Sequence, residues 1–349
     1  MNKSFQIGNH TIGAGHAPYI IAEMSGNHNH DLSRALRIID AARQAGVHAV
    51  KIQTYTADTI TLDHDGDEFL IKEGLWTGRN LYALYEEAHT PWDWHKKMFD
   101  HAAQQGITLF SSPFDKTAID FLEDLNAPAY KIASFELIDL PLIRYAAQTG
   151  KPLIMSTGLA TKEEISEAVE AVQESGNQNL VVLHCVSGYP SEPSEANLAT
   201  MVDIAREFDL LTGLSDHSHG IAVPVAATAL GASVIEKHIT LSRAEGGVDS
   251  AFSLEPQEFT DLVSTCQMAH SALGEVNYDL KDSERENQQF RRSLYVVADI
   301  AKGEKLTAEN IRSIRPGLGL KPKYFDALIG RTAAQDIPRG QPLSWDMLE

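Results

Sequence analysis

The chain has 349 residues with 43% hydrophobic residues and a formal net charge of −19. Its length suits one large domain, or a large and a small one, and its negative charge disfavours nucleic acid or an anionic membrane as a partner. No apolar run reaches the ~20 residues of a membrane span, and no signal peptide opens the chain. Cys185 and Cys266 lie far apart and show no disulfide framework or metal-ligand spacing. We therefore expect a cytoplasmic protein.

The elements expected from the sequence begin with a hairpin at residues 5–15, placed to close one end of a larger structure. From residue 19 onward a short β-branched run, a polar break and an amphipathic helical stretch alternate. Eight strands are predicted, at residues 19–24, 49–55, 108–113, 129–134, 152–158, 180–186, 211–218 and 233–241.

The sequence also predicts where several helices begin and end. Thr161 and Glu164 have the spacing of a capping box, and the helical stretches end in glycine before the next strand, at Gly46, Gly106, Gly150 and Gly231. Eight strand–helix units predict an α/β fold of the (β/α)8 TIM-barrel type. An open doubly wound sheet is the alternative, which the absence of a G-x-G-x-x-G sequence disfavours.

The pattern changes after the barrel region, assigned to residues 1–280. Residues 281–290 are charged and poor in apolar residues, which predicts a linker. In the following small domain, residues 291–349, segments 298–311 and 335–348 resemble each other, which predicts internal pseudo-symmetry. A separate insertion, roughly residues 56–90, follows the second strand and is a place for substrate-facing structure.

Chemistry in such a barrel occurs at the carboxyl ends of the strands. Those ends carry Glu23, Lys51 with Gln53, Ser111 with Ser112, Lys131 with Ser134, Ser156, Ser187, Ser215 with His217, and Glu236 with His238. A lone strand lysine is usually a solvated residue, but polar residues at all eight ends predict a site. Two lysines on neighbouring strands among serines suit a phosphate or carboxylate, although either could instead pair with Glu23 or Glu136.

Two histidines at adjacent strand ends indicate a metal site. His217 and His238 would meet across the barrel mouth, and two imidazoles with oxygen ligands suit a divalent metal such as Mn²⁺. His28 and His30 in the loop after Glu23 are spaced too nonspecifically to indicate a second one.

Together, the segments "IAEMSGNHN", "VKIQTYTADTIT", "SSPFD", "YKIASFE", "STGLAT", "GLSDHS" and "IEKHITL" resemble the sialic acid synthase family. The tail, "RRSLYVVADIAKGE" with "IRPGLG", is similar to that family's antifreeze-like (SAF) domain. The resemblance covers essentially the whole chain. It implies a (β/α)8 barrel that condenses phosphoenolpyruvate with an amino-sugar aldehyde to give a nine-carbon 2-keto acid and phosphate.

Within the family, "EMSGNHN", "LYEEAHTPWDWH" and "SRAEGGVDSAFSLEP" resemble the pseudaminic acid branch. The N-acetylneuraminate and N,N'-diacetyllegionaminate branches, which use the same chemistry, stay open as alternatives. The resemblance implies 2,4-diacetamido-2,4,6-trideoxy-β-L-altropyranose as the sugar, and bacterial surface glycans such as those of flagellin as the destination of the product.

Residue roles follow from the same resemblance. Glu23 matches the catalytic carboxylate that guides the attacking water. His217 and His238 match ligands of a divalent metal, Mn²⁺ before Mg²⁺ or Co²⁺. The phosphoenolpyruvate contacts match Lys51, Ser112, Lys131, Ser134, Ser156, Ser187, Ser215 and Arg315, and the sugar-facing positions match Gln53, Glu136, Tyr189 and Asp249. Arg315 matches an arginine that the SAF domain delivers to the partner subunit, which implies a domain-swapped homodimer.

One departure and two rival functions remain. Ser187, in "VSGYP", stands where sialic acid synthases have asparagine, and its shorter side chain either widens the sugar pocket or changes one contact. An aldolase that forms a Schiff base on Lys131 or Lys237 would fit the same barrel. A non-catalytic sugar-binding protein is the other rival, and the retained acid, histidines and lysines argue against it.

Overall fold

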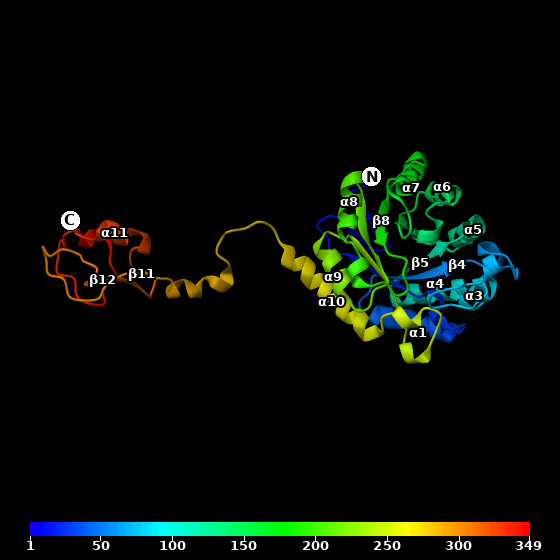
Figure 1. The fold of residues 1–349 in the computed structure, drawn as a ribbon, viewed down its shortest axis with the longest axis horizontal. Helices are drawn as coiled ribbons and strands as arrows, with labels where there is room; N and C mark the ends of the chain where they lie inside the picture. The colour runs from blue at the N-terminus through cyan, green and yellow to red at the C-terminus, as the bar shows by residue number, and fades with distance from the viewer. The chain divides into compact units, whose positions relative to one another are not determined.

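The computed structural model describes all 349 residues, which divide into two compact units, Met1–Gly274 and Glu275–Glu349 (Figure 1). The division falls before the predicted linker at 281–290. That segment holds two short 3-10 turns, Asp282–Glu284 and Glu286–Phe290, and every residue from 271 to 292 is exposed. No helix combines the length and the apolar character that crossing a membrane requires.

The first unit is the predicted barrel. Its eight parallel strands close in the order β10-β3-β4-β5-β6-β7-β8-β9, which excludes the open doubly wound sheet. The strands are β3 (Tyr19–Glu23), β4 (Ala49–Thr54), β5 (Thr108–Pro113), β6 (Tyr130–Ile132), β7 (Leu153–Ser156), β8 (Leu180–Cys185), β9 (Leu211–Asp216) and β10 (Val234–His238). Each lies within one of the eight predicted runs.

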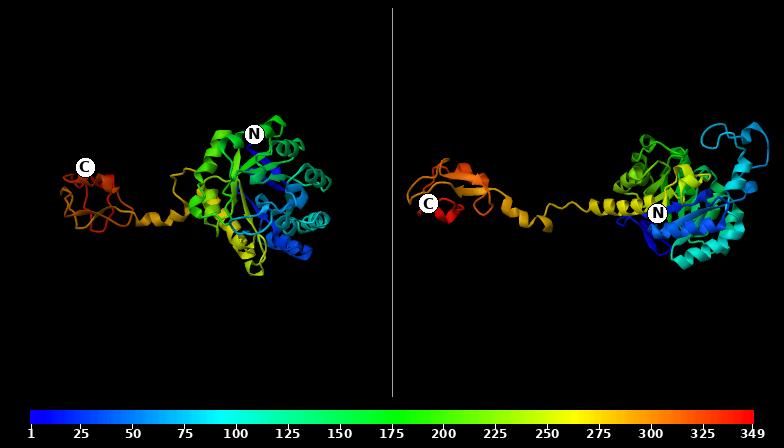
Figure 2. Two further views of the ribbon diagram at one scale, coloured as in Figure 1. Left: turned by 45° about the vertical axis from the view of Figure 1, so that its right-hand side comes forward. Right: turned by 90° about the horizontal axis from the view of Figure 1, so that it is seen from below.

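Helices surround the strands, as Figures 1 and 2 show. They are α1 (Leu32–Gln44), α2 (Ala57–Ile60), α3 (Leu81–Ala88), α4 (Trp92–Gln105), α5 (Lys116–Asp124), α6 (Leu140–Gln148), α7 (Lys162–Glu174), α8 (Ala199–Phe208), α9 (Ala222–Ala229) and α10 (Pro256–Leu273). Ile38 and Ile39 of α1 pack with Ile20 and Ala22 of β3 in a core between strands and helices. The outward faces of the strands are therefore buried, and polar chemistry is confined to the barrel mouth.

The local boundary signals are confirmed. Thr161 and Glu164 form the capping box of α7. Gly46, Gly106, Gly150 and Gly231 all have positive φ, between 70° and 95°, which glycine adopts without steric cost.

The N-terminal hairpin closes one end of the barrel, as predicted. Its strands, β1 (Ser4–Ile7) and β2 (His10–Gly13), pair antiparallel. Phe5, Ile7 and Ile12 pack against residues near the amino ends of the barrel strands, among them Tyr19 and Val234. This end is filled by apolar side chains, which leaves the carboxyl ends as the open face of the barrel.

The second unit carries the predicted internal symmetry around β11 (Ser293–Val296), β12 (Ile311–Ile314) and the short α11 (Phe325–Leu328). Ile300 and Ile337 exchange two backbone hydrogen bonds. The two repeat aspartates then act alike: Asp299 accepts from the backbone N–H of Arg339, and Asp336 accepts from that of Lys302. The repeat seen in the sequence is thus a structural repeat.

Candidate active site

The strand register brings the predicted residues together at the carboxyl ends. Glu23 of β3 lies in register with Lys51 of β4 on one side and with His238 of β10 on the other. Because side chains alternate along a strand, Glu236 and His238 share one face, and Lys237 points to the other. Lys237 pairs with Asp216 and the carbonyl of Ser218, away from this group, which removes it as a Schiff-base lysine at the site.

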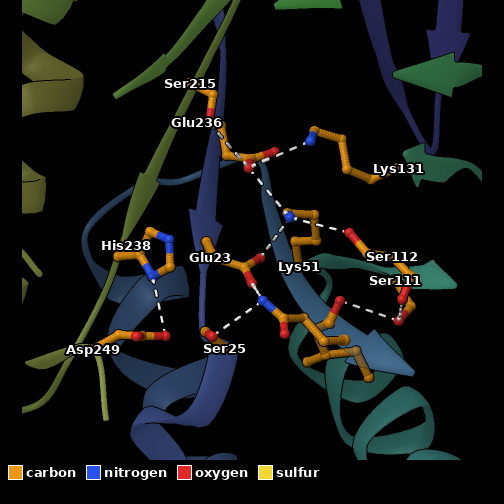
Figure 3. A network of polar contacts seen from close by, with 12 residues as sticks. Glu23, Ser25, Lys51, Ser111, Ser112, Lys131, Ser215, Glu236, His238 and Asp249 are labelled. Carbon is orange, nitrogen blue, oxygen red and sulfur yellow. Dashed lines mark hydrogen bonds and ion pairs between the residues drawn. The ribbon is translucent and has the colours of Figure 1, made fainter. Parts of the chain in front are cut away.

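Two lysines and two glutamates form the centre of the site (Figure 3). Lys51 Nζ lies 3.0 Å from Glu23 Oε2, 3.2 Å from Glu236 Oε1 and 3.2 Å from Ser112 Oγ. Lys131 Nζ is 4.0 Å from Glu236 Oε1 and donates to the carbonyl of Ile132. All four charged groups are almost completely buried. The two lysines are not on neighbouring strands, as the sequence suggested, because β5 lies between β4 and β6.

Burial and charge set the protonation of these groups in different directions. Burial raises the pKa of Glu23, and the attraction of Lys51 offsets only part of that effect. Burial also raises the pKa of Glu236, but Lys131 and Lys51 outweigh it and hold the pKa below its usual value. For Lys51 the two glutamates overcome the effect of burial and raise the pKa. Lys131 has a lowered pKa because burial exceeds the help from Glu236. Of these two glutamates, Glu23 is therefore the one whose surroundings favour uptake of a proton.

Several polar groups around this centre lack a partner. Ser156 Oγ, Ser187 Oγ, Glu136 Oε2 and Glu236 Oε2 are buried without a hydrogen bond. Buried polar groups are normally paired, so a cluster of free ones at a barrel mouth indicates a polar ligand. Of the other predicted serines, Ser134 accepts from the backbone N–H of Gly158, and Ser215 lies 3.5 Å from Glu236 Oε1.

The two predicted metal ligands lie side by side, with ring centroids 5.3 Å apart. His217 Nδ1 is 3.0 Å from the carbonyl of Val186, which leaves its Nε2 for a ligand. His238 Nδ1 is buried without a hydrogen bond, 3.8 Å from Asp249 Oδ2. No group of three or more His, Cys, Asp and Glu side chains assembles here. The donor set therefore fits a divalent ion that takes two nitrogens from the protein and oxygens from a substrate or water.

The predicted sugar-facing residues border the same mouth. Gln53 donates to Glu23 Oε1 at 2.8 Å and to Ser25 Oγ at 3.1 Å, so it orients the carboxylate. Tyr189 packs on His217 at a centroid distance of 4.4 Å. Burial raises the pKa of Glu136 to about 7, although Lys131 opposes the shift. Arg315 belongs to the second unit.

Three residues of the site had no role assigned from the sequence. Glu236, noted only as a strand-end residue, bridges the two lysines; its spacing from His238 was the available signal. Ser25 completes the hydrogen bonds of Gln53. Trp76 comes from the insertion and donates to the carbonyl of Val248 at 3.0 Å. Neither Ser25 nor Trp76 stands in a periodic pattern that would mark it.

His28, the first of the two loop histidines, is held by contacts within the protein. His28 is buried, its Nδ1 accepts from the backbone N–H of His30, and its Nε2 lies 3.4 Å from Thr90 Oγ1. Both ring nitrogens are engaged, and burial lowers the pKa of His28 to about 4. The side chain of His28 is therefore part of the internal packing of this loop.

Comparison with known proteins agrees with this geometry. Residues 38–278 match the NeuB family model, and residues 291–349 match the SAF domain. The chain belongs to the NeuB family. Among its relatives, pseudaminic acid synthase of Campylobacter jejuni is 47% identical, over 93% of this chain and 95% of that one. Pseudaminic acid synthase of Helicobacter pylori is 43% identical, over 95% and 98%.

More distant NeuB relatives include the N,N'-diacetyllegionaminic acid synthase of Legionella pneumophila, 33% identical over 95% of this chain and 94% of that one. A crystal structure of N-acetylneuraminic acid synthetase from Leptospira borgpetersenii has a TM-score of 0.73 at 31% identity, over 81% and 94% of the chains. The spore coat polysaccharide biosynthesis protein SpsE of Bacillus subtilis has a TM-score of 0.68 at 32% identity, over 99% of both.

Proposed function

We propose that this chain is a pseudaminic acid synthase. It condenses phosphoenolpyruvate with 2,4-diacetamido-2,4,6-trideoxy-β-L-altropyranose and water to give pseudaminic acid and phosphate. The observation that carries the proposal is the buried group of two lysines, two glutamates and free serine hydroxyls at the barrel mouth. The higher identity to the pseudaminic acid synthases than to the legionaminic acid synthase supports this branch of the family.

Phosphoenolpyruvate fits the lysine side of the site. Lys131 has a single acidic partner, Glu236, whose Oε1 is 4.0 Å away. The pKa of Lys131 is lowered, so a nearby anion would stabilise its charged form. A bound phosphate or carboxylate would supply that charge and would use the free hydroxyls of Ser156 and Ser187. In the proposed domain-swapped homodimer, Arg315 of one copy adds a further positive charge to the site of the other.

The dimer is tested by the mass of the protein in solution. One chain has a mass of 38.3 kDa, and sedimentation equilibrium should give twice that value. A stable monomer with full activity would exclude the delivery of Arg315 by a partner.

The reaction forms one carbon–carbon bond and breaks one carbon–oxygen bond. The enol carbon of phosphoenolpyruvate attacks the aldehyde carbon, whose oxygen becomes a hydroxyl after it gains a proton. Positive charge develops on the adjacent phosphoenolpyruvate carbon, and water adds there while Glu23 takes its proton. The resulting intermediate then releases phosphate together with the bridging oxygen, and the keto acid closes to its ring. Gln53 holds Glu23 in place for the water.

His217 and His238 would hold the divalent metal, for which Mn²⁺ is the first candidate. When bound, the metal would act as a Lewis acid toward the aldehyde oxygen. We expect EDTA to abolish phosphate release and Mn²⁺ to restore it. His238→Ala should weaken Mn²⁺ binding, measured by calorimetry, by more than the ~10–100-fold typical of losing an outer-shell partner. A matched change of an exposed histidine beside the N-terminal hairpin, His16→Ala, should leave binding unaltered. Unaltered Mn²⁺ affinity in His238→Ala would remove this histidine from the metal site.

Gly158 provides a steric test of the phosphoenolpyruvate side. A Cβ at this position would lie 2.1 Å from Ser187 Oγ and 2.8 Å from Ser134 Oγ. Gly158→Ala must therefore displace both serines, at a cost of ~1–3 kcal/mol. We expect the KM for phosphoenolpyruvate to rise about tenfold, since ~1.4 kcal/mol corresponds to a factor of ten.

Gly188→Ala in the neighbouring loop is the control, because its Cβ would meet atoms no closer than 3.4 Å. An unchanged KM for phosphoenolpyruvate in Gly158→Ala would mean that Ser134 and Ser187 do not contact that substrate.

The branch is tested by phosphate release from phosphoenolpyruvate with Mn²⁺ and one sugar at a time. The sugars are the diacetamido altrose, the corresponding legionaminate precursor and N-acetylmannosamine. Release with the altrose sugar alone supports the proposed substrate. Release with only one of the other two keeps the chemistry and moves the enzyme to another branch.

A further inference from the structure

The insertion between β4 and α4 extends beyond the compact barrel and exposes most of its side chains. Residues 61–79 include the short 3-10 turn Asp67–Phe69 and a hairpin-like return in which Leu70 pairs with Asn80. Leu62 is 59% exposed and Leu75 is 46% exposed, so the loop has little apolar core of its own. Segments with few buried contacts open at low free-energy cost. This segment lies in the light blue part of the ribbon in Figure 2.

Trp76 is the exception at the tip of this loop. It is half-buried, whereas its neighbours Leu75 and Thr77 are exposed. Its indole N–H donates to the carbonyl of Val248 at 3.0 Å, and this is the one hydrogen bond that links residues 61–79 to a loop outside the insertion. The tip is therefore fixed to the barrel through a single tryptophan.

The partners of Trp76 belong to the site. Its ring lies 5.6 Å from that of Tyr189, which in turn packs on His217 at 4.4 Å. Val248 directly precedes Asp249, whose Oδ2 is 3.8 Å from His238 Nδ1. Trp76 thus joins the loops that follow β4, β8 and β10, next to the two histidines.

The chemistry of this corner is aromatic. Trp76, Tyr189 and the buried Phe252 form a chain of rings, with 5.4 Å between the centroids of Tyr189 and Phe252. Aromatic faces beside a polar site hold apolar groups of a ligand while the polar groups fix its orientation. The lysines and serines suit an anion, whereas this corner suits methyl groups and carbon–hydrogen faces of a sugar.

We propose that Trp76 closes the sugar subsite, and that its indole and the ring of Tyr189 contact the apolar substituents of the amino sugar, its acetamido and deoxy methyl groups. The inference rests on the proposed function and assigns the specificity of that same site to a residue of the insertion. The inference also makes a distinction between the two substrates. Trp76 should affect the binding of the sugar and should not affect the binding of phosphoenolpyruvate.

Steady-state kinetics of three variants test the proposal. Trp76→Ala removes the ring and should raise the KM for the sugar about 10- to 100-fold, the range expected when apolar contacts with a substrate are lost. The KM for phosphoenolpyruvate should stay within about twofold. Trp76→Phe keeps a ring but loses the bond to Val248, so its effect should be intermediate. Leu75→Ala, at the exposed neighbouring position, is the control and should behave as wild type.

A second readout works without turnover. Titration of the Mn²⁺-loaded protein with each sugar should change tryptophan fluorescence in the wild type and leave Trp76→Phe unresponsive. If the wild-type protein releases no phosphate with any sugar, the proposed function fails, while the titration still reports on Trp76. If the wild type turns over and Trp76→Ala keeps its KM for the sugar, or raises both KM values equally, Trp76 is only an anchor of the loop and the inference is wrong.

Discussion

Glu23→Gln should lower kcat by about 10²- to 10⁴-fold, the usual contribution of a general base. Glu23 is 1% exposed, its pKa is raised by burial, and Gln53 fixes its orientation. Glutamine keeps the shape of the side chain but cannot take the proton of the attacking water. The KM values for both substrates should change little, because the lost interaction belongs to the transition state. Rapid-quench or steady-state assays of phosphate release measure the effect.

Glu170→Gln on the exposed face of α7 is the matched control, with wild-type activity expected. The thermal unfolding of Glu23→Gln should be compared with wild type so that loss of structure is not mistaken for loss of catalysis. Normal turnover by a folded Glu23→Gln protein would assign the base to another group, with Glu236 as the nearest carboxylate on the same lysine.

Lys51→Met should have the largest effect on stability. Lys51 balances Glu23 at 3.0 Å and Glu236 at 3.2 Å, and all three side chains are buried. Removing one partner of a buried ion pair leaves uncompensated charge and typically costs ~3–5 kcal/mol in the free energy of unfolding. Activity should also be lost, since we propose that the same lysine binds phosphoenolpyruvate. Denaturant unfolding of the wild type and of Lys51→Met at the same pH measures the difference in the free energy of unfolding.

The pH dependence of this cost has a definite sign. Burial raises the pKa of Glu23, and Lys51 lowers it. Without Lys51 the pKa of Glu23 should therefore rise further, so that this carboxylate becomes charged only at a higher pH. The deficit of Lys51→Met should therefore be largest above the raised pKa and shrink as the pH falls and Glu23 is protonated. Lys96→Met is the control: Lys96 pairs with Asp100 on the surface, and exposed pairs contribute ~0–1 kcal/mol. Equal destabilisation by the two changes would contradict a balanced buried centre.

Much of the barrel could be predicted because its signals are local. Each strand is a short β-branched run, and the helix ends carry capping residues and glycines that have the same meaning in any context. The repeat of the second unit was visible because Asp299 and Asp336 stand at equivalent positions in the two segments. Both residues make the same kind of contact with the backbone. The predicted side chains at the strand ends converge because parallel strands place their carboxyl ends at one rim.

What could not be predicted depends on contacts between distant segments. Glu236 becomes central only when β10 closes against β3 and brings it within reach of Lys51. The role of Trp76 depends on how an irregular loop folds back, and such loops carry no periodicity. Alternation along β10 separates Lys237 from the site, a distinction that a lysine near a strand end does not reveal by itself.

The central claim is that this barrel joins phosphoenolpyruvate to a sugar with cleavage of the carbon–oxygen bond. Phosphoenolpyruvate labelled with ¹⁸O at its bridging oxygen tests it most directly, with Mn²⁺ and the diacetamido altrose present. The account predicts phosphate release that requires the sugar, with the label in the released phosphate, as mass spectrometry would detect. Release that does not depend on the sugar, or label retained in the keto acid, would contradict it.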